Sequence, residues 1–293
     1  MTRRREVSAL LVTVTVLLGA CQAHASPSAS AAASTSSAVP SPSATARPVG
    51  WSVVTIGDSI GFAQDDCGGC PSFTTLFSRA IEVKVGKPVH GMNLSTQDNL
   101  TGKRLVARIK TSAPMRAAVA GAQIVIVSIG HNDTPWNSID DPCDGDTGNM
   151  PRWTSYTGTC VVALAKRHSQ ELDAILTQIE MLRAGAPTAI LVLADYNDII
   201  GWGQAPPEAN ARSVEVLNAF YAETCRVAKV HHAICVDVYH SFNGTTGWTA
   251  AGDLLTDDYT APSAKGQRRI ADLLAKASLV PLVPASSPAP SSP

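Results

Sequence analysis

The chain has 293 residues and a formal net charge of −1, from 23 basic and 24 acidic side chains, and 45% of its residues are hydrophobic. This near-neutral balance offers no basic surface to a nucleic-acid backbone. The chain also has no run of about 18 apolar residues, the length that a membrane-spanning helix needs. Nucleic-acid binding and multispan membrane roles are therefore excluded, and the apolar content suffices for one sizeable core.

The N-terminus carries the features of an export signal. Three arginines at residues 3–5 precede an apolar stretch at 7–18, and small residues follow up to Cys21. We expect residues 1–20 to be a signal peptide, because the apolar stretch is too short to cross a bilayer. The Leu-Gly-Ala-Cys ending resembles the lipobox of bacterial lipoproteins, which implies lipidation of Cys21 and anchoring on the outer face of the cell membrane. The alternative is an ordinary cut near Ala25 and a secreted product.

Residues 21–49 and 281–293 are dominated by Ala, Ser, Pro and Thr. Segments with so few large apolar side chains cannot offset the entropy of ordering. We expect a disordered tether and a disordered tail, which leaves residues 50–280 as the folded domain.

Within this domain, short apolar segments alternate with segments of helical periodicity. The expected strands are residues 52–56, 89–94, 123–129, 189–194 and 233–238. The expected helices are residues 71–85, 100–110, 161–184, 207–228 and the segment from 263 onward. Apolar strands separated by helices predict an α/β fold with a five-stranded parallel sheet, doubly wound and flavodoxin-like. Its ligand site is expected at the carboxyl ends of the strands.

Seven cysteines are present, and setting Cys21 aside leaves an even number. In an exported chain this indicates disulfides. The order along the chain suggests three local bridges: Cys67 with Cys70, Cys143 with Cys160, and Cys225 with Cys235. A redox or zinc motif at residues 67–70 is the alternative for the first pair.

Three motifs follow predicted strands or precede the last helix. Gly57-Asp58-Ser59-Ile60 follows the first strand and presents a hydroxyl where a nucleophile would lie. Gly130-His131-Asn132-Asp133 follows the third strand and presents an amide that could donate to an oxyanion. Asp258-Tyr259-Thr260-Ala261-Pro262 comes just before the last helix. Each motif alone is commonly structural, but their order and placement together indicate a catalytic site.

On these motifs the chain resembles the SGNH, or GDSL, hydrolase family over residues 51–277. The resemblance implies a three-layer α/β/α fold and serine ester hydrolysis, with Ser59 as nucleophile. The oxyanion hole would comprise the Ser59 backbone N–H, the Asn132 side chain and a backbone N–H near Asp98, where the family has glycine. The implied substrate is a lipid or acetylated carbohydrate ester, with no metal or organic cofactor, and we expect a monomer.

The sequence departs from the family at the general base. The family ends with Asp-x-x-His followed by Pro and Gly, and here Asp258, Pro262 and Gly266 are in register but Ala261 occupies the histidine position. Loss of the base lowers turnover of serine hydrolases by roughly 10⁴ to 10⁶. We therefore expect an inactivated esterase, and the alternative is a non-catalytic, surface-anchored protein that binds a lipid or glycan.

Other histidines could replace the base. His131 adjoins Asn132 and could line the pocket. His240 and Asp237 repeat the Asp-x-x-His spacing but lack the following Pro and Gly, so we expect His240 to lie in a loop. His231 and His232 precede the fifth strand, where we expect a solvated turn.

The long connection at residues 132–160 is expected to cap the site, held by the bridge from Cys143 to Cys160. Aromatic side chains in this and later loops could form a wall for an acyl chain or a sugar, or could simply pack the loops: Trp136, Trp153, Tyr156, Trp202 and Trp248. Four aspartates could hold calcium, although a solvated acidic face is the simpler interpretation: Asp140, Asp141, Asp144 and Asp146.

Overall fold

The computed structural model describes residues 50–62, 67–138, 143, 151–279 and 282. The chain divides into two units, residues 1–46 and 47–293, and the described residues all belong to the second. The predicted signal peptide, Cys21, the tether, the four-aspartate cluster and the predicted tail except residue 282 lie outside the described residues.

Five parallel strands form one sheet in the order β2-β1-β3-β4-β5. The strands are β1 (Trp51–Gly57), β2 (Val89–Asn93), β3 (Ile124–Ser128), β4 (Ala189–Ala194) and β5 (Ile234–Asp237). The predicted α/β fold with a five-stranded parallel sheet is therefore confirmed. From β1 the chain adds β2 on one side and then returns to add β3, β4 and β5 on the other side. The point between β1 and β3 where this succession switches sides is where doubly wound sheets bind ligands.

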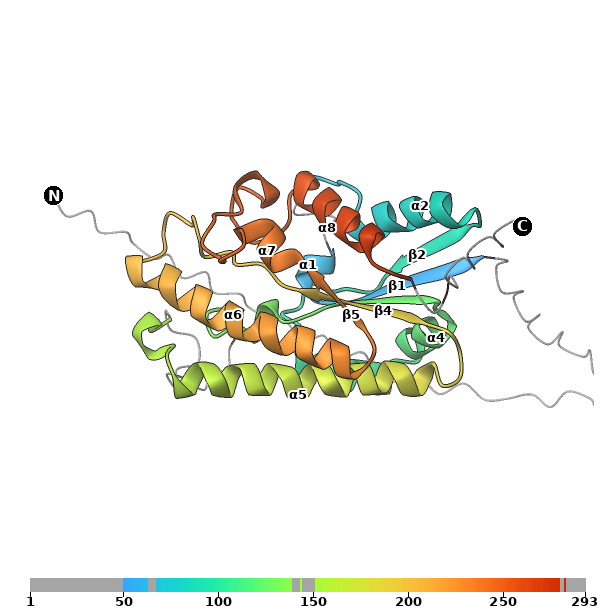
Figure 1. Cartoon of the computed structure of the whole chain (residues 1–293), viewed down its shortest axis with the longest axis horizontal. Helices are drawn as coiled ribbons and strands as arrows, with labels where there is room; N and C mark the ends of the chain where they lie inside the picture. The colour runs from blue at the N-terminus through green and yellow to red at the C-terminus, as the bar shows by residue number, and fades with distance from the viewer. Residues whose placement is uncertain (1–49, 63–66, 139–142, 144–150, 280–281, 283–293) are drawn as a thin grey trace, which may run out of the picture. The chain divides into compact units, whose positions relative to one another are not determined.

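Helices cover both faces of the sheet (Figure 1). One face carries α2 (Phe73–Val85), α7 (Val238–Asn243) and α8 (Ala264–Lys276), and the other carries α3 (Gly102–Thr111), α4 (Ala113–Gly121), α5 (Thr159–Leu182) and α6 (Pro207–Val230). Successive residues of β1 show the division, because Val53 packs toward α2 and α8 while Val54 packs toward α3, α4 and α5. Burial on both faces explains why the strands are continuous apolar runs.

Three α-helices were not expected from the sequence: the short α1 (Ser59–Phe62), α4 and α7. The helix α4 begins after Ser112, whose hydroxyl accepts from the Met115 N–H, with a proline in the first turn. The helix α7 follows β5 directly because Asp237 caps it, accepting from the N–H of His240. The expectation that His240 lies in a loop is therefore wrong, since a capping aspartate starts a helix where the strand stops.

The three disulfides join Cys67 to Cys70, Cys143 to Cys160 and Cys225 to Cys235, which is the pairing that the order of cysteines predicts. Among the described residues, no helix has the length and apolarity needed to cross a bilayer.

Candidate active site

The turn after β1 places Ser59 at the edge of the sheet. Gly57 has φ +153°, and a β-carbon there would overlap the carbonyl of Ser128 on β3, so only glycine fits. The Asp58 N–H donates to this same carbonyl at 2.9 Å. Ser59 then opens the short helix α1 (Ser59–Phe62) directly beyond the sheet.

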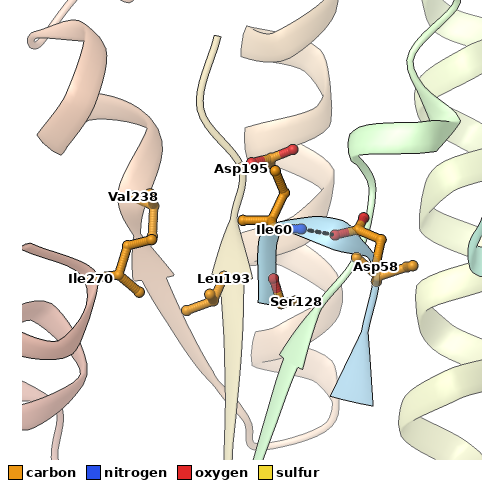
Figure 2. A pocket seen from close by; sticks show the side chains of 8 residues that line it. Asp58, Ile60, Ser128, Leu193, Asp195, Val238 and Ile270 are labelled. Atoms are coloured by element: carbon orange, nitrogen blue, oxygen red, sulfur yellow. Dashed lines mark hydrogen bonds between the residues drawn. The ribbon is translucent and has the colours of Figure 1, made fainter. Parts of the chain in front are cut away.

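Asp58 ties the serine motif to the asparagine motif. Its carboxylate accepts from the Ile60 N–H at 3.1 Å, shown in Figure 2, and from the His131 N–H at 3.3 Å. Burial, together with the charge of Asp195 at the end of strand β4, raises the pKa of Asp58 to about 8. The cavity drawn in Figure 2, beside Asp58 and Ile60, measures about 10 Å³, which leaves room for one water at most.

Asn132 lies in a single 3₁₀ turn, His131–Asp133, that follows β3. Its side-chain amide donates to the Leu100 carbonyl at 3.2 Å, and the adjacent Asp133 accepts from the Gly102 N–H at 3.0 Å. The bond to the Leu100 carbonyl fixes the direction of the Asn132 side chain, and the bond of Asp133 ties the turn to the start of α3.

Ser59, Asn132 and Ala261 meet at one cavity of about 340 Å³, which we call the serine pocket. It is lined by Ser59, Gln97, Asn99, His131, Asn132, Asn137, Thr260 and Ala261. Asp98 lines an adjoining groove, with its carboxylate 2.6 Å from the Arg108 guanidinium, while its neighbours Gln97 and Asn99 line the serine pocket. The role of Asp98 as an oxyanion donor stays a prediction.

The loop that carries Ala261 is well ordered by its own hydrogen bonds. The Thr256 hydroxyl donates to Asp258 at 2.6 Å and accepts from the Ala261 N–H at 3.3 Å, and the first of these bonds lowers the pKa of Asp258. The Tyr196 hydroxyl donates to the Thr260 carbonyl at 3.1 Å from the far side. Ala261 itself is 3% exposed. The loop therefore holds its shape with a methyl group where the family has an imidazole.

His131 lines the serine pocket as part of a buried ionic cluster. Its Nδ1 lies 3.2 Å from Asp195, and its Nε2 lies 3.7 Å from Asp198 and 3.2 Å from the Asn137 amide. Burial disfavours its imidazolium, but the hydrogen bond to Asp195 and the charges of Asp198, Asp195 and Asp58 outweigh that effect and raise the pKa to about 10. His131 thus keeps its proton at neutral pH, which makes it a poor general base.

His240 lies elsewhere. Its Nδ1 is 2.9 Å from Asp237 on the same turn, and its ring packs against Tyr221 and Tyr239. It is not among the residues that line the serine pocket.

Three residues at the site were not expected from the sequence: Asp195, Tyr196 and Asp198. All three follow the predicted strand 189–194, and a position at the end of a strand, like that of Ser59, is a signal that could have identified them. Their partners are far away in sequence, since His131 and Asp195 are 64 residues apart.

A second cavity of about 250 Å³ adjoins the first, and we call it the aromatic pocket. Its lining includes Trp136, Trp153, Trp202, Tyr259 and Asp258, and it shares Asn137 and Thr260 with the serine pocket. Tyr156 is fully buried among the loops, as the packing interpretation expects, while Trp248 is 53% exposed.

Comparison with known proteins gives a single family. Residues 55–269 match the sequence model of the GDSL-like lipase/acylhydrolase family. No curated protein gives a significant match.

Several solved structures share the fold. The lipase Lip_vut3 from a goat rumen metagenome has a TM-score of 0.60 at 14% identity, covering 76% of this chain and 95% of that one. A lipase/acylhydrolase from Enterococcus faecalis has a TM-score of 0.52 at 15% identity, with 77% and 93% covered. The acetyl-xylooligosaccharide esterase Axe2 from Geobacillus has a TM-score of 0.53 at 16% identity, with 79% and 97% covered. At these identities the likeness establishes the fold alone.

Proposed function

Because the chain belongs to the GDSL-like lipase/acylhydrolase family, we propose that it is a serine ester hydrolase whose nucleophile is Ser59 and whose turnover is blocked at Ala261. The observation that carries the proposal is the serine pocket, where the Ser59 motif, the Asn132 motif and the Ala261 loop meet around one cavity.

In the proposed reaction the Ser59 hydroxyl oxygen bonds to the ester carbonyl carbon. The resulting oxyanion would be stabilised by the Asn132 amide and the Ser59 backbone N–H. A base must take the serine proton and pass it to the departing alcohol, after which water releases the acyl group. A methyl group at Ala261 can do neither.

His131 does not fill this gap in the proposal. It shares the serine pocket, but its ring nitrogens already face Asp195 and Asp198 and its raised pKa keeps it protonated. The Asp258 loop, in contrast, keeps its hydrogen bonds and its place beside the pocket. The missing imidazole is therefore the defect that blocks proton transfer in the proposed machinery.

The test is ester hydrolysis by the mature chain, its Ala261→His variant and an Ala261→His/Ser59→Ala control, with p-nitrophenyl acetate and p-nitrophenyl octanoate. We expect kcat/KM of Ala261→His to exceed that of the parent by roughly 10⁴-fold, and the double variant to lose this gain. The absence of any Ser59-dependent gain would refute the proposal. If the parent is already active through Ser59, another group supplies the base, and His131→Gln is the first variant to examine.

For the substrate we propose an ester of a lipid or an acetylated carbohydrate. The family description and the esterase activity named for the Geobacillus structure support this range. We also propose export and a lipid anchor at Cys21, on the strength of the N-terminal sequence. In that case Cys21→Ser should move the protein from the membrane fraction to the medium.

A binding protein on the same fold is the second candidate. It is favoured by the combination of a pocket that lacks a base and an adjoining aromatic pocket, which together could hold an ester without cleaving it. An Ala261→His variant that folds but stays inert would favour this candidate.

A further inference from the structure

We propose that the aromatic pocket binds a carbohydrate ring, the alcohol portion of an ester whose acyl group lies in the serine pocket. The orientation of the ester rests on the proposed function. The choice of ligand rests on the aromatic pocket itself, whose described lining joins flat rings to carboxylate and amide groups.

The aromatic side chains that line the pocket are held in place by contacts with one another and with buried residues. The rings of Trp136 and Trp153 stack with centroids 5.5 Å apart, and Trp153 meets the edge of the buried Tyr156 at 5.6 Å. The Trp136 indole N–H donates to Asp198 at 3.3 Å, which fixes the rotation of that ring. A preformed wall costs a ligand little ordering entropy on binding.

Polar groups lie beside these rings. Asp198 and Asp258 bring carboxylates to the pocket, and Asn137 and Gln204 bring amides. Asp198 is buried and already accepts from the Trp136 N–H, with His131 nearby, but a carboxylate can accept about four hydrogen bonds. A ligand that covers it without donating to it would therefore leave its remaining acceptor sites desolvated. A sugar ring avoids this cost because its hydroxyls can donate to carboxylate and amide oxygens.

Sugar rings also match the aromatic surface. The faces of indole and phenol rings are electron-rich, and the C–H groups on one face of a pyranose present a weakly positive apolar surface to them. An acyl chain would match the rings but not the carboxylates. The mixed lining therefore favours a carbohydrate over a fatty acyl chain.

The two pockets together define the direction of the ester. They share Asn137 and Thr260, so a ring in the aromatic pocket lies beside the cavity of Ser59. The serine pocket is lined by polar side chains, among them Gln97, Asn99 and Asn132, which suits a short acyl group better than a long one.

Binding can be measured on the chain as it stands, with probes that carry no ester bond and so cannot be cleaved by an esterase. We would titrate xylotetraose, cellotetraose and chitotetraose, with octanoate as the acyl probe, and follow tryptophan fluorescence and heat of binding. We expect saturable binding of at least one tetrasaccharide below about 10 mM, and none of octanoate. Trp202→Ala should weaken the sugar about tenfold or more, since aromatic anchors carry much of the affinity of a site.

Trp248→Ala is the matched control, because this tryptophan is exposed and does not line the aromatic pocket. It should leave the sugar affinity unchanged, and the thermal midpoint of each variant reports whether it folds. Binding of octanoate in place of the sugars would overturn the proposal. So would failure of all three sugars, or equal effects of Trp202→Ala and Trp248→Ala.

A second arm separates this proposal from the proposed function. In the Ala261→His background, Trp202→Ala should raise KM for acetylated xylotetraose about tenfold, whereas Trp248→Ala should leave this KM unchanged. If Ala261→His is inert but the tetrasaccharides bind, the ester-hydrolase proposal fails and the sugar site stands. If Ala261→His is active and Trp202→Ala changes neither sugar binding nor KM, the sugar site fails and the hydrolase stands.

Discussion

The glycine in the first turn of α8 connects the stability of the fold to the geometry of the Ala261 loop. A β-carbon on Gly266 would overlap the Leu254 carbonyl and lie 3.0 Å from the β-carbon of Pro262. The Leu254 carbonyl is not free to retreat, because it accepts from the Ser263 N–H at 2.9 Å. Gly266→Ala must therefore push α8 and the segment before Ala261 apart.

The expected cost follows from opposing contributions. Alanine in place of glycine in a helix gains up to about 1 kcal/mol. Overpacking against a fixed backbone costs about 1–3 kcal/mol, and a strained hydrogen bond to the Leu254 carbonyl adds about 1 kcal/mol. We expect Gly266→Ala to lower the free energy of unfolding by about 2 kcal/mol, or the thermal midpoint by about 4–8 °C.

Gly121→Ala is the matched control, because Gly121 ends α4 and nothing lies within 4 Å of its hypothetical β-carbon. It should raise the free energy of unfolding by about 0.5 kcal/mol. Urea unfolding followed by tryptophan fluorescence measures both variants. In the Ala261→His background Gly266→Ala should also lower kcat, since a displaced base is a poor base. A Gly266→Ala variant as stable as the parent would refute this reasoning.

Three further predictions concern the Tyr196 hydroxyl, the His231 ion pairs and the third disulfide. Tyr196→Phe removes the hydrogen bond to the Thr260 carbonyl and should lower the free energy of unfolding by about 1 kcal/mol. In the Ala261→His background it should lower kcat more than it raises KM, because Tyr196 positions the loop that carries residue 261. The same kcat with and without Tyr196→Phe would contradict this positioning role. Burial disfavours the imidazolium of His231, but its hydrogen bonds to two carboxylates of α5, each at 3.0 Å, outweigh that effect and raise its pKa. Because the folded pKa lies above the unfolded one, the stabilisation is full below the unfolded pKa and is lost as pH rises through the folded pKa. In urea unfolding, His231→Gln should therefore lower the free energy of unfolding by about 0.2–1 kcal/mol at pH 5.5 and by less at pH 9. A difference in stability between parent and variant that does not narrow at pH 9 would be inconsistent with the ion pairs. Replacing both Cys225 and Cys235 by alanine opens a loop of sequence separation 10 and should lower the free energy of unfolding by about 3 kcal/mol. The loss is measured as a lower urea midpoint. An unchanged midpoint would show that the bridge does not stabilise the fold.

His231 also shows where local interpretation failed. The expected turn is present at residues 231–232 and His232 is exposed, but the His231 side chain is only 9% exposed and bridges Asp173 and Glu180 of α5. The residues near His231 in the sequence do not predict these two partners, which lie 58 and 51 residues away along the chain. Packing of α6 along α5 brings them together.

The sequence alone determined the alternation of strands and helices, the three local disulfides and the placement of Ser59 and Asn132 at strand ends. These features depend on hydrophobic periodicity, on glycine at tight turns and on cysteines close in the chain, all of which act over a few residues. The match of residues 55–269 to one family rests on the same local motifs.

Only the tertiary structure decided what surrounds those motifs. The cluster of His131 with Asp195 and Asp198 joins the ends of β3 and β4, and the aromatic pocket joins Trp136, Trp202 and Tyr259 from three separate connections. The charge state of His131 and the lining of that pocket depend on burial and on neighbours distant in sequence. Such long-range contacts arise only when the sheet and its two helical layers are assembled, because burial and charge neighbours belong to the packed fold and not to any local segment.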